Sequence, residues 1–247
     1  MKLNICAASN VGSVRLNNED MILVGPDYVR DDDIKCKVDL SSVDRYLVAL
    51  ADGMGGHNGG DIASSDVLHN LCFFFGDLPT GLNVSDFNES IFGWMESINC
   101  IIDSKGRSNP LYREMGTTLV AFAFYAGEFY WMNCGDSRLY RLRDGVLTQL
   151  STDHSLSNLM GESGHSGIIT NCIGGGCKTS YIDIVKCTQD VTLDDVYLLC
   201  SDGLTDMVND TIIEQMLNKG ADANSLCEAA IAAGGYDNVS ACVIKIE

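Results

Sequence analysis

One stretch of the chain, residues 46–60, reads YLVALADGMGGHNGG. Its first half is a continuous apolar run, which predicts a strand buried on both faces of a sheet. The run ends at Asp52, and five of the nine residues from 52 to 60 are glycine. A backbone with so few side chains can approach a ligand closely and present carbonyl or amide groups to it. The stretch therefore predicts a central strand that carries an acid and an open loop to one end of a sheet.

The glycine-rich half matches neither of the common nucleotide-binding loops. It lacks the Gly-Lys-Ser/Thr ending of a phosphate-binding P-loop, and its spacing departs from GxGxxG. The alternative interpretation is a flexible turn in front of a helix, which we expect between Asp61 and Phe75.

Acids recur at the ends of other predicted strands. Asp136 follows YWMNCG, Asp202 follows VYLLCS, and Asp237 stands just before the last strand, Val239–Ile246. A charge at the end of an apolar strand is costly unless it is paired or binds a cation. Oxygen ligands without Cys or His favour Mg²⁺ or Mn²⁺. The alternative is that each Asp caps its own turn, as Asp-Gly pairs often do.

A polar segment near the start of the chain, residues 15–20, reads RLNNED. Arg15 offers a planar fork that suits a phosphate group. Glu19 and Asp20 add further carboxylates to the candidate set. An ordinary polar surface loop is the alternative interpretation.

The composition excludes several classes of function. Sixteen basic against 34 acidic residues give a formal charge of −18, so we expect neither nucleic acid nor an anionic membrane as a partner. A like-charged second copy is not attracted either, and we expect a monomer. Eleven cysteines, mostly inside apolar runs, indicate small buried hydrophobic residues in a reduced cytosol. No leader or membrane-spanning run is visible, so we expect a soluble cytoplasmic protein.

The pattern along the chain predicts one α+β domain over residues 1–247. Hairpin signals at Ala126-Gly127 and Asp144-Gly145 separate apolar runs. Helical spacing follows Asp86 and Asp210, and Ser225 with Glu228 predicts a capping box. The acidic segment from Asp27 to Asp44 is interpreted as a solvated loop. Many antiparallel strands with helices inserted in blocks predict an α+β sandwich.

Together these segments resemble the metal-dependent protein phosphatases, also called the protein phosphatase 2C family, and most closely their bacterial members. Seven stretches match in family order and span nearly the whole chain: VRLNNED (14–20), DGMGGHNGG (52–60), MGTTLV (115–120), NCGDSRLYRL (133–142), LTQLSTDHS (147–155), LLCSDGLTDMV (198–208) and YDNVSACVI (236–244). One such motif is weak, whereas seven in order are highly specific.

The resemblance implies a central β-sandwich of two antiparallel sheets flanked by α-helices, which is an α-β-β-α fold, and a site for two Mn²⁺ or Mg²⁺ ions. It implies that Asp52 bridges both ions and that Asp202 and Asp237 hold the first. The Gly53 carbonyl and Glu19 serve the second. It further implies that Asp136 and Asp202 hold a third, weaker ion. Arg15 then binds the substrate phosphate. Asp20 and Asn238 lie behind the metal ligands and orient them.

The resemblance also implies the reaction. A metal-activated water hydrolyses phosphoserine or phosphothreonine on proteins, opposing a Ser/Thr kinase. The chain departs from some relatives in two places. Met54 stands where they carry His, and His57 is expected to structure its loop instead. The segment from Leu156 to Thr170, where relatives often carry a flap, is short.

Two functions of different class remain open. The first is an active phosphatase acting on phosphorylated proteins. The second is an inactive pseudophosphatase that only binds a partner. Retention of Asp52, Asp202 and Asp237 favours the enzyme, because a pseudoenzyme usually lacks one of these acids.

Overall fold

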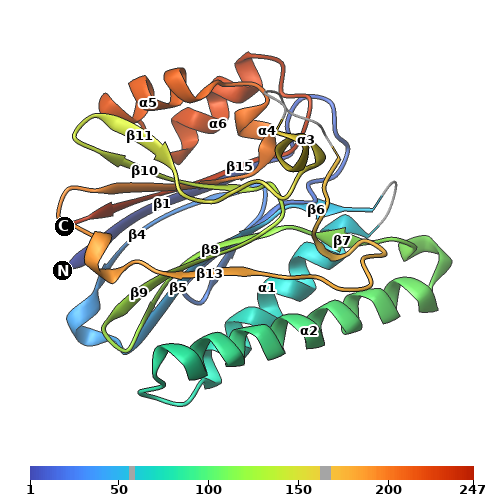
Figure 1. Ribbon diagram of the computed structural model, residues 1–247. Coiled ribbons are helices and arrows are strands. Elements are labelled where there is room, and N and C mark those ends of the chain that lie inside the picture. Colours follow the sequence, from blue (N-terminus) through green and yellow to red (C-terminus); the bar gives the residue numbers. More distant parts are fainter. Residues whose placement is uncertain (56–58, 162–167) are drawn as a thin grey trace.

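Two antiparallel sheets pack face to face at the centre of the molecule, as the computed structural model in Figure 1 shows. The structure describes residues 1–55, 59–161 and 168–247. The first sheet has six strands in the order β11 (Val146–Gln149), β10 (Arg138–Arg143), β14 (Val196–Cys200), β15 (Val239–Ile246), β1 (Lys2–Asn10) and β4 (Asp33–Asp39). The second has six in the order β13 (Asp183–Lys186), β9 (Glu128–Cys134), β8 (Leu119–Tyr125), β5 (Arg45–Ala51), β2 (Met21–Val24) and β3 (Asp27–Val29).

Apolar side chains from both sheets fill the space between them. Phe122 of β8 and Tyr197 of β14 stack with ring centroids 4.5 Å apart. Ile5 and Leu50 are fully buried in the same cluster. Because both faces of β5, β8 and β14 are covered, these strands are apolar apart from Arg45 at the start of β5, as the apolar runs in the sequence predicted.

Helices cover the outer face of each sheet, which confirms the expected α-β-β-α arrangement (Figure 1). The second sheet is covered by α1 (Gly60–Asp77) and α2 (Val84–Ser108), and the first by α5 (Asp210–Asn218) and α6 (Ala223–Ala232). Asn83 caps α2 by accepting a hydrogen bond from the Asp86 N–H at 3.0 Å. Two shorter helices, α3 (Leu156–Met160) and α4 (Asp202–Thr205), lie at one end of the sandwich.

A small third sheet stands at that same end. It consists of β12 (Ile173–Gly174), β7 (Gly116–Thr117) and β6 (Gly53–Met54), in that order. The two chain termini lie at the opposite end of the sandwich (Figure 1). The small sheet thus places the DGM stretch beside segments that are distant in the sequence.

Two local predictions were wrong. The segment from Asp27 to Asp44 is not only a loop, because it contains β3 and the edge strand β4. In β4 the apolar residues Ile34, Cys36 and Val38 alternate with polar ones and pack against the core. The N-cap of helix α6 is Asp222 rather than Ser225, and the Asp222 carboxylate accepts from the Ser225 N–H at 3.0 Å.

Some expectations concern residues outside the described ranges. His57 lies there, and so does the middle of the segment from Leu156 to Thr170. All eleven cysteines are described, and each is a free thiol. No helix in the described ranges is long and apolar enough to cross a membrane.

Candidate active site

Asp52 is fixed by its backbone at the end of β5. Its N–H donates to Thr118 Oγ1 at 3.1 Å, and its carbonyl accepts from Thr117 Oγ1 at 2.8 Å. Both threonines are fully buried. The MGTTLV stretch therefore holds the strand end from which the Asp52 carboxylate projects. Nothing in the sequence assigned the threonines this role, although their place in a matched motif was a signal.

The position of Gly53 has no room for a larger residue. A Cβ built on it would lie 2.1 Å from the Gly60 carbonyl oxygen and 2.6 Å from that of Glu19. A Cβ on Gly60 would lie 2.7 Å from the Glu19 side chain. Gly53 and Gly60 thus pack tightly against each other and against Glu19.

Asp20 is the most enclosed acid of the cluster. One carboxylate oxygen accepts from Ser201 Oγ at 2.8 Å, while the other has no hydrogen-bond partner. Burial, together with the nearby charges of Asp202 and Asp237, raises the pKa of Asp20 to about 7. Ser201 was not predicted as part of the site, because a serine at a strand end carries no distinctive pattern.

Asp136 and Asp52 share with Asp20 a pKa that is raised by burial and by neighbouring carboxylates. Asp136 is buried with one oxygen unpartnered, and burial and the charge of Asp202 raise its pKa to about 7. Burial, followed by the charges of Asp20 and Asp202, raises the pKa of Asp52 well above its ordinary value. The strand-end acids are therefore close enough to repel one another, as the sequence predicted.

Arg15 and Asp237 form an ion pair at the open side of this cluster. An Arg15 guanidinium nitrogen donates to Asp237 Oδ2 at 2.6 Å, and about half of the Arg15 side chain is exposed. The Asn238 N–H donates to the other Asp237 oxygen at 2.8 Å. The two residues thus meet directly, although we expected one to bind phosphate and the other a metal ion.

The Asn238 side chain fastens the N-terminal loop to the site. Its amide group donates to the Val11 and Asn17 carbonyls, each at 2.9 Å. Its oxygen accepts from the Glu19 N–H at 2.9 Å. Asn238 therefore touches Asp237 through its backbone, while its side chain positions the loop that carries Arg15 and Glu19.

The donor set fits hard divalent cations. The acids carry only oxygen ligands, and buried carboxylate oxygens of Asp20 and Asp136 lack partners within the protein. Over residues 1–55, 59–161 and 168–247, no three His, Cys, Asp or Glu side chains already converge as a closed set of ligands. The Asp237 carboxylate is paired with Arg15. A cation at this position would therefore compete with Arg15 for that carboxylate.

A buried ion pair supports the neighbouring loop. Arg138 of the GDSR stretch binds Asp153 through Nε at 3.0 Å and through a terminal nitrogen at 2.7 Å. His154 Nδ1 accepts from the Gly135 N–H at 3.1 Å, and Nε2 faces Asp183 at 3.1 Å. Because Nδ1 is an acceptor, Nε2 carries the proton. These contacts fix the turn that presents Asp136.

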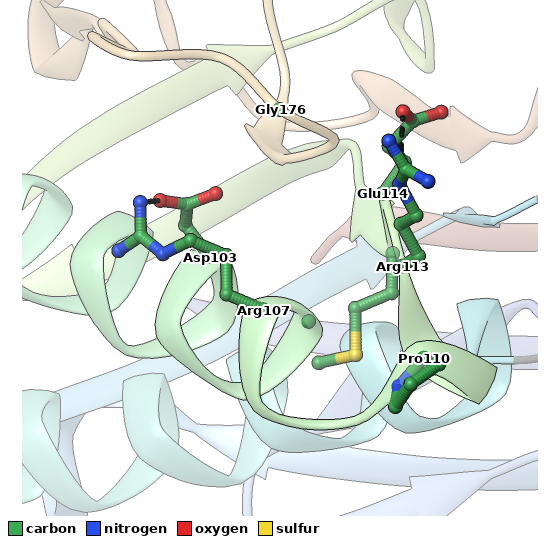
Figure 2. A pocket seen from close by; sticks show the side chains of 8 residues that line it. Asp103, Arg107, Pro110, Arg113, Glu114 and Gly176 are labelled. Atoms are coloured by element: carbon green, nitrogen blue, oxygen red, sulfur yellow. Dashed lines mark ion pairs between the residues drawn. The ribbon is translucent and has the colours of Figure 1, made fainter.

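A pocket of about 390 Å³ lies beside the glycine-rich loop (Figure 2). Its lining includes Gly106, Arg107, Pro110, Arg113, Met115 and Gly176. Met115 lies next to β7, and a Cβ on Gly59 would be 3.1 Å from the Met115 Cβ. In Figure 2 the turn at Gly176 closes one side of the pocket. The pocket therefore adjoins the candidate active site without containing its acids.

Comparison with known proteins gives consistent matches. The protein phosphatase 2C family profile matches residues 26–230. The serine/threonine protein phosphatase PstP of Mycobacterium tuberculosis is 33% identical over 99% of this chain and 45% of its own length. Protein phosphatase PhpP of Streptococcus pneumoniae is 30% identical over 99% of this chain and 98% of its own. The chain thus spans about half the length of PstP and nearly all of PhpP.

Solved structures agree with the sequence matches. The Mycobacterium tuberculosis serine/threonine phosphatase PstP/Ppp superposes with a TM-score of 0.77 at 32% identity, covering 100% of both chains. A Streptococcus agalactiae serine/threonine phosphatase gives 0.81 at 26% identity, covering 99% of this chain and 100% of that one. The catalytic domain of PstP in complex with two manganese ions gives 0.72 at 31% identity, covering 99% and 100%.

Proposed function

The chain belongs to the protein phosphatase 2C family, and on this basis we propose that it is a metal-dependent protein-serine/threonine phosphatase. The observation that carries the proposal is the cluster of acids from five segments at one end of the sandwich, where burial and mutual repulsion raise the pKa values of Asp20, Asp52 and Asp136. Within the described residues, Asp20 and Asp136 each keep a buried carboxylate oxygen without a hydrogen-bond partner, which a bound cation would satisfy.

The metal assignments follow the matched motifs. Asp52 is proposed to bridge two Mn²⁺ or Mg²⁺ ions, with Asp202 and Asp237 on the first. The Gly53 carbonyl and Glu19 are proposed for the second. A third, weaker ion is assigned to Asp136 with Asp202. When bound, such ions lower the pKa of a water molecule and offset charge on the phosphoryl group.

Arg15 is proposed to bind the substrate phosphate. Its partner Asp237 is also a proposed metal ligand, so the two roles are linked. Once Asp237 turns to a cation, the Arg15 fork is available for two phosphate oxygens. Asn238 supports this exchange because it holds the loop of Arg15 and Glu19 independently of the Asp237 carboxylate.

The substrate class is also a proposal. The relatives are named as serine/threonine protein phosphatases, and we extend to this chain their action on phosphorylated proteins, opposing a Ser/Thr kinase. We further propose that the protein works as a monomer in the cytoplasm. Eleven free thiols support a reducing compartment, and the charge of −18 disfavours self-association.

The direct test is hydrolysis of p-nitrophenyl phosphate and of a phosphothreonine peptide, with Mn²⁺, with Mg²⁺ and with EDTA. We expect turnover with Mn²⁺ that EDTA removes. Asp52→Ala should abolish it while the circular dichroism spectrum stays unchanged. The matched control is Asp194→Asn, a change at an exposed acid remote from the cluster, which should keep full turnover.

The same experiment tests the binding-only alternative. Folded protein that binds Mn²⁺ but hydrolyses neither substrate would overturn the phosphatase proposal in favour of a pseudophosphatase. Hydrolysis of p-nitrophenyl phosphate without hydrolysis of the peptide would overturn the protein-substrate part alone.

A further inference from the structure

Two cysteines face each other across a tight turn beside the candidate active site. The sulfurs of Cys172 and Cys177 are 3.5 Å apart. Between them lie Gly174, Gly175 and Gly176, all with positive φ angles between 60° and 77°. The Cys177 N–H donates to the Gly174 carbonyl at 2.9 Å. The three glycines let the chain reverse sharply enough to bring the two thiols into contact.

The turn is held in this shape by a buried asparagine of α2. The Asn99 side-chain oxygen accepts from the Gly174 N–H at 2.7 Å, and its amide group donates to the Cys177 carbonyl at 3.3 Å. The hydroxyl of Ser180 bonds both Asn99 and the Cys172 carbonyl. The two sulfurs are therefore kept near each other by the fold and do not meet by chance.

The two thiols differ in access to solvent. Cys172 is 5% exposed, whereas Cys177 is partly exposed at the edge of the turn. Burial and the neighbouring Cys177 raise the pKa of the Cys172 thiol to about 12. An oxidant from solvent therefore meets Cys177 first and has Cys172 directly behind it.

We propose that Cys172 and Cys177 form a redox-active dithiol, which a hydroperoxide converts into a disulfide that closes this turn. The sulfurs must approach by about 1.5 Å to reach the length of an S–S bond. The glycines between them provide the freedom for that movement. The bond formation is independent of the function proposed above.

The chemistry balances in two steps with hydrogen peroxide as the oxidant. The Cys177 sulfur attacks one peroxide oxygen, so an S–O bond forms, the O–O bond breaks and water leaves. The Cys172 sulfur then attacks the Cys177 sulfur, the S–O bond breaks, and the Cys172 proton leaves with hydroxide as a second water. Two thiols are oxidised to one disulfide, and one peroxide is reduced to two waters.

The turn is linked to the candidate active site through the small third sheet. Ile173 and Gly174 pair with Thr117 and Gly116, which in turn pair with Gly53 and Met54. The Gly175 N–H also donates to the Met115 carbonyl at 2.8 Å. The same turn closes the pocket at Gly176 (Figure 2). Closing the disulfide should therefore shift the strand beside Gly53 and reduce turnover at least about threefold.

The test is peptide mapping by mass spectrometry of reduced, metal-free protein before and after exposure to hydrogen peroxide. We expect a 172–177 disulfide, with a mass loss of about 2 Da, that dithiothreitol reverses. Cys172→Ser and Cys177→Ser should each prevent it. Cys100→Ser removes an exposed thiol of α2 and should leave it intact.

The possible results distinguish a failure of the dithiol proposal from a failure of the proposed function. Oxidation of Cys177 to sulfinic acid without a disulfide, or pairing of Cys172 with Cys134, would overturn the proposal. Turnover measured on the same samples after Mn²⁺ has been added back rests on the proposed function. A formed disulfide with unchanged turnover would overturn the link to the active site alone. Reduced protein without turnover would count against the phosphatase and not against the dithiol.

Discussion

The acids at the two ends of β14 have opposite electrostatic surroundings. Asp195 precedes the strand, and its side chain is 1% exposed. Burial alone raises its pKa, but hydrogen bonds from Arg143 at 2.7 Å and from the Thr192 N–H at 2.9 Å outweigh burial and hold the pKa below its ordinary value. Asp202 follows the strand, and its charge contributes to the raised pKa values of Asp20, Asp52 and Asp136. At this end Asp20 and Asp136 each keep a buried carboxylate oxygen without a hydrogen-bond partner.

This difference distinguishes structural acids from functional ones. Asp20 is buried as fully as Asp195, yet burial, reinforced by the charges of Asp202 and Asp237, raises its pKa to about 7, because hydrogen bonds from serine hydroxyl groups offset burial only in part. Burial by itself therefore does not tell which acid serves stability. What separates the two kinds of acid is whether the protein supplies a charged partner. An acid without such a partner gains most from binding a cation.

The largest expected effect comes from removing a charge at the acidic end. Asp52→Asn should lower Mn²⁺-dependent turnover at least about a thousandfold, equivalent to about 4 kcal/mol of activation free energy. In EDTA the same variant should melt at an equal or higher temperature, because burial and the charges of Asp20 and Asp202 already disfavour a carboxylate at this position. Steady-state kinetics and thermal melting test both parts. A variant that loses stability in EDTA would show that Asp52 serves stability and would overturn the comparison.

The next effect comes from the opposite end of β14. Arg143→Met leaves Asp195 buried without its charged partner and should lower the free energy of unfolding by about 3 kcal/mol. Turnover of the folded protein should be unchanged. Urea unfolding and kinetics provide the measurements. The matched change Arg15→Met, at a half-exposed pair, should alter stability by no more than about 0.5 kcal/mol, and equal losses for the two variants would contradict the comparison.

A smaller effect is expected on substrate binding. Arg15→Met removes the proposed phosphate ligand and should raise KM for a phosphopeptide by about ten- to a hundredfold, as expected for one charged hydrogen-bonding group. The Mn²⁺ concentration for half-maximal activity should not rise, because Asp237 loses a competitor for its carboxylate. Weaker Mn²⁺ dependence together with an unchanged KM would assign Arg15 to support of the metal ligands instead.

The smallest effect is a change of slope with pH. Asp20 has a folded-state pKa of about 7 against about 3.9 when unfolded. Between these values the folded protein keeps a proton that the unfolded chain has lost, so stability falls as pH rises. Asp20→Asn should flatten the decline, by at most about 1.4 kcal/mol per pH unit, in urea unfolding with EDTA between pH 4 and 7.

A matched acid with the opposite shift serves as the control. Hydrogen bonds from Lys35 and Ser225 lower the pKa of Asp222 to about 2. Its contribution is complete above the unfolded value of about 4 and is lost only as the pH falls towards 2. Asp222→Asn should therefore leave the slope between pH 4 and 7 unchanged. A flattened slope would mean that the slope depends on the net charge of the protein and not on the titration of Asp20.

Much of the fold could be predicted because its central strands are apolar throughout. The bounds of Val239–Ile246 were predicted correctly, and Asp52 and Asp202 were recognised by the abrupt change from apolar run to acid. The edge strand β4 was missed because only alternate residues are covered, so its acids obscured the period of two. A strand with one solvated face is easily mistaken for a polar loop.

The site was harder to predict where partners come from distant segments. Arg15 and Asp237 are 222 positions apart, and no local pattern joins them. Ser201 and the buried threonines at 117 and 118 act through hydroxyl groups, whose partners depend on strand register. The sequence therefore proposed the acids as candidates, whereas the groups that hydrogen-bond to them could be found only from the three-dimensional arrangement.

The pairing of the first and last strands has a consequence for synthesis on the ribosome. β1 pairs with β15 over eight positions, from Leu3 with Ile246 to Asn10 with Val239, and lies inside the first sheet. Glu19 follows β1 and Asp237 precedes β15, so Asn238 can fasten the two only after both have been made. During translation β1 can pair with β4, but its other edge stays unpaired until β15 has been made, and this open edge is exposed to chaperones. Asp237 can join the other acids only after this late segment has left the exit tunnel.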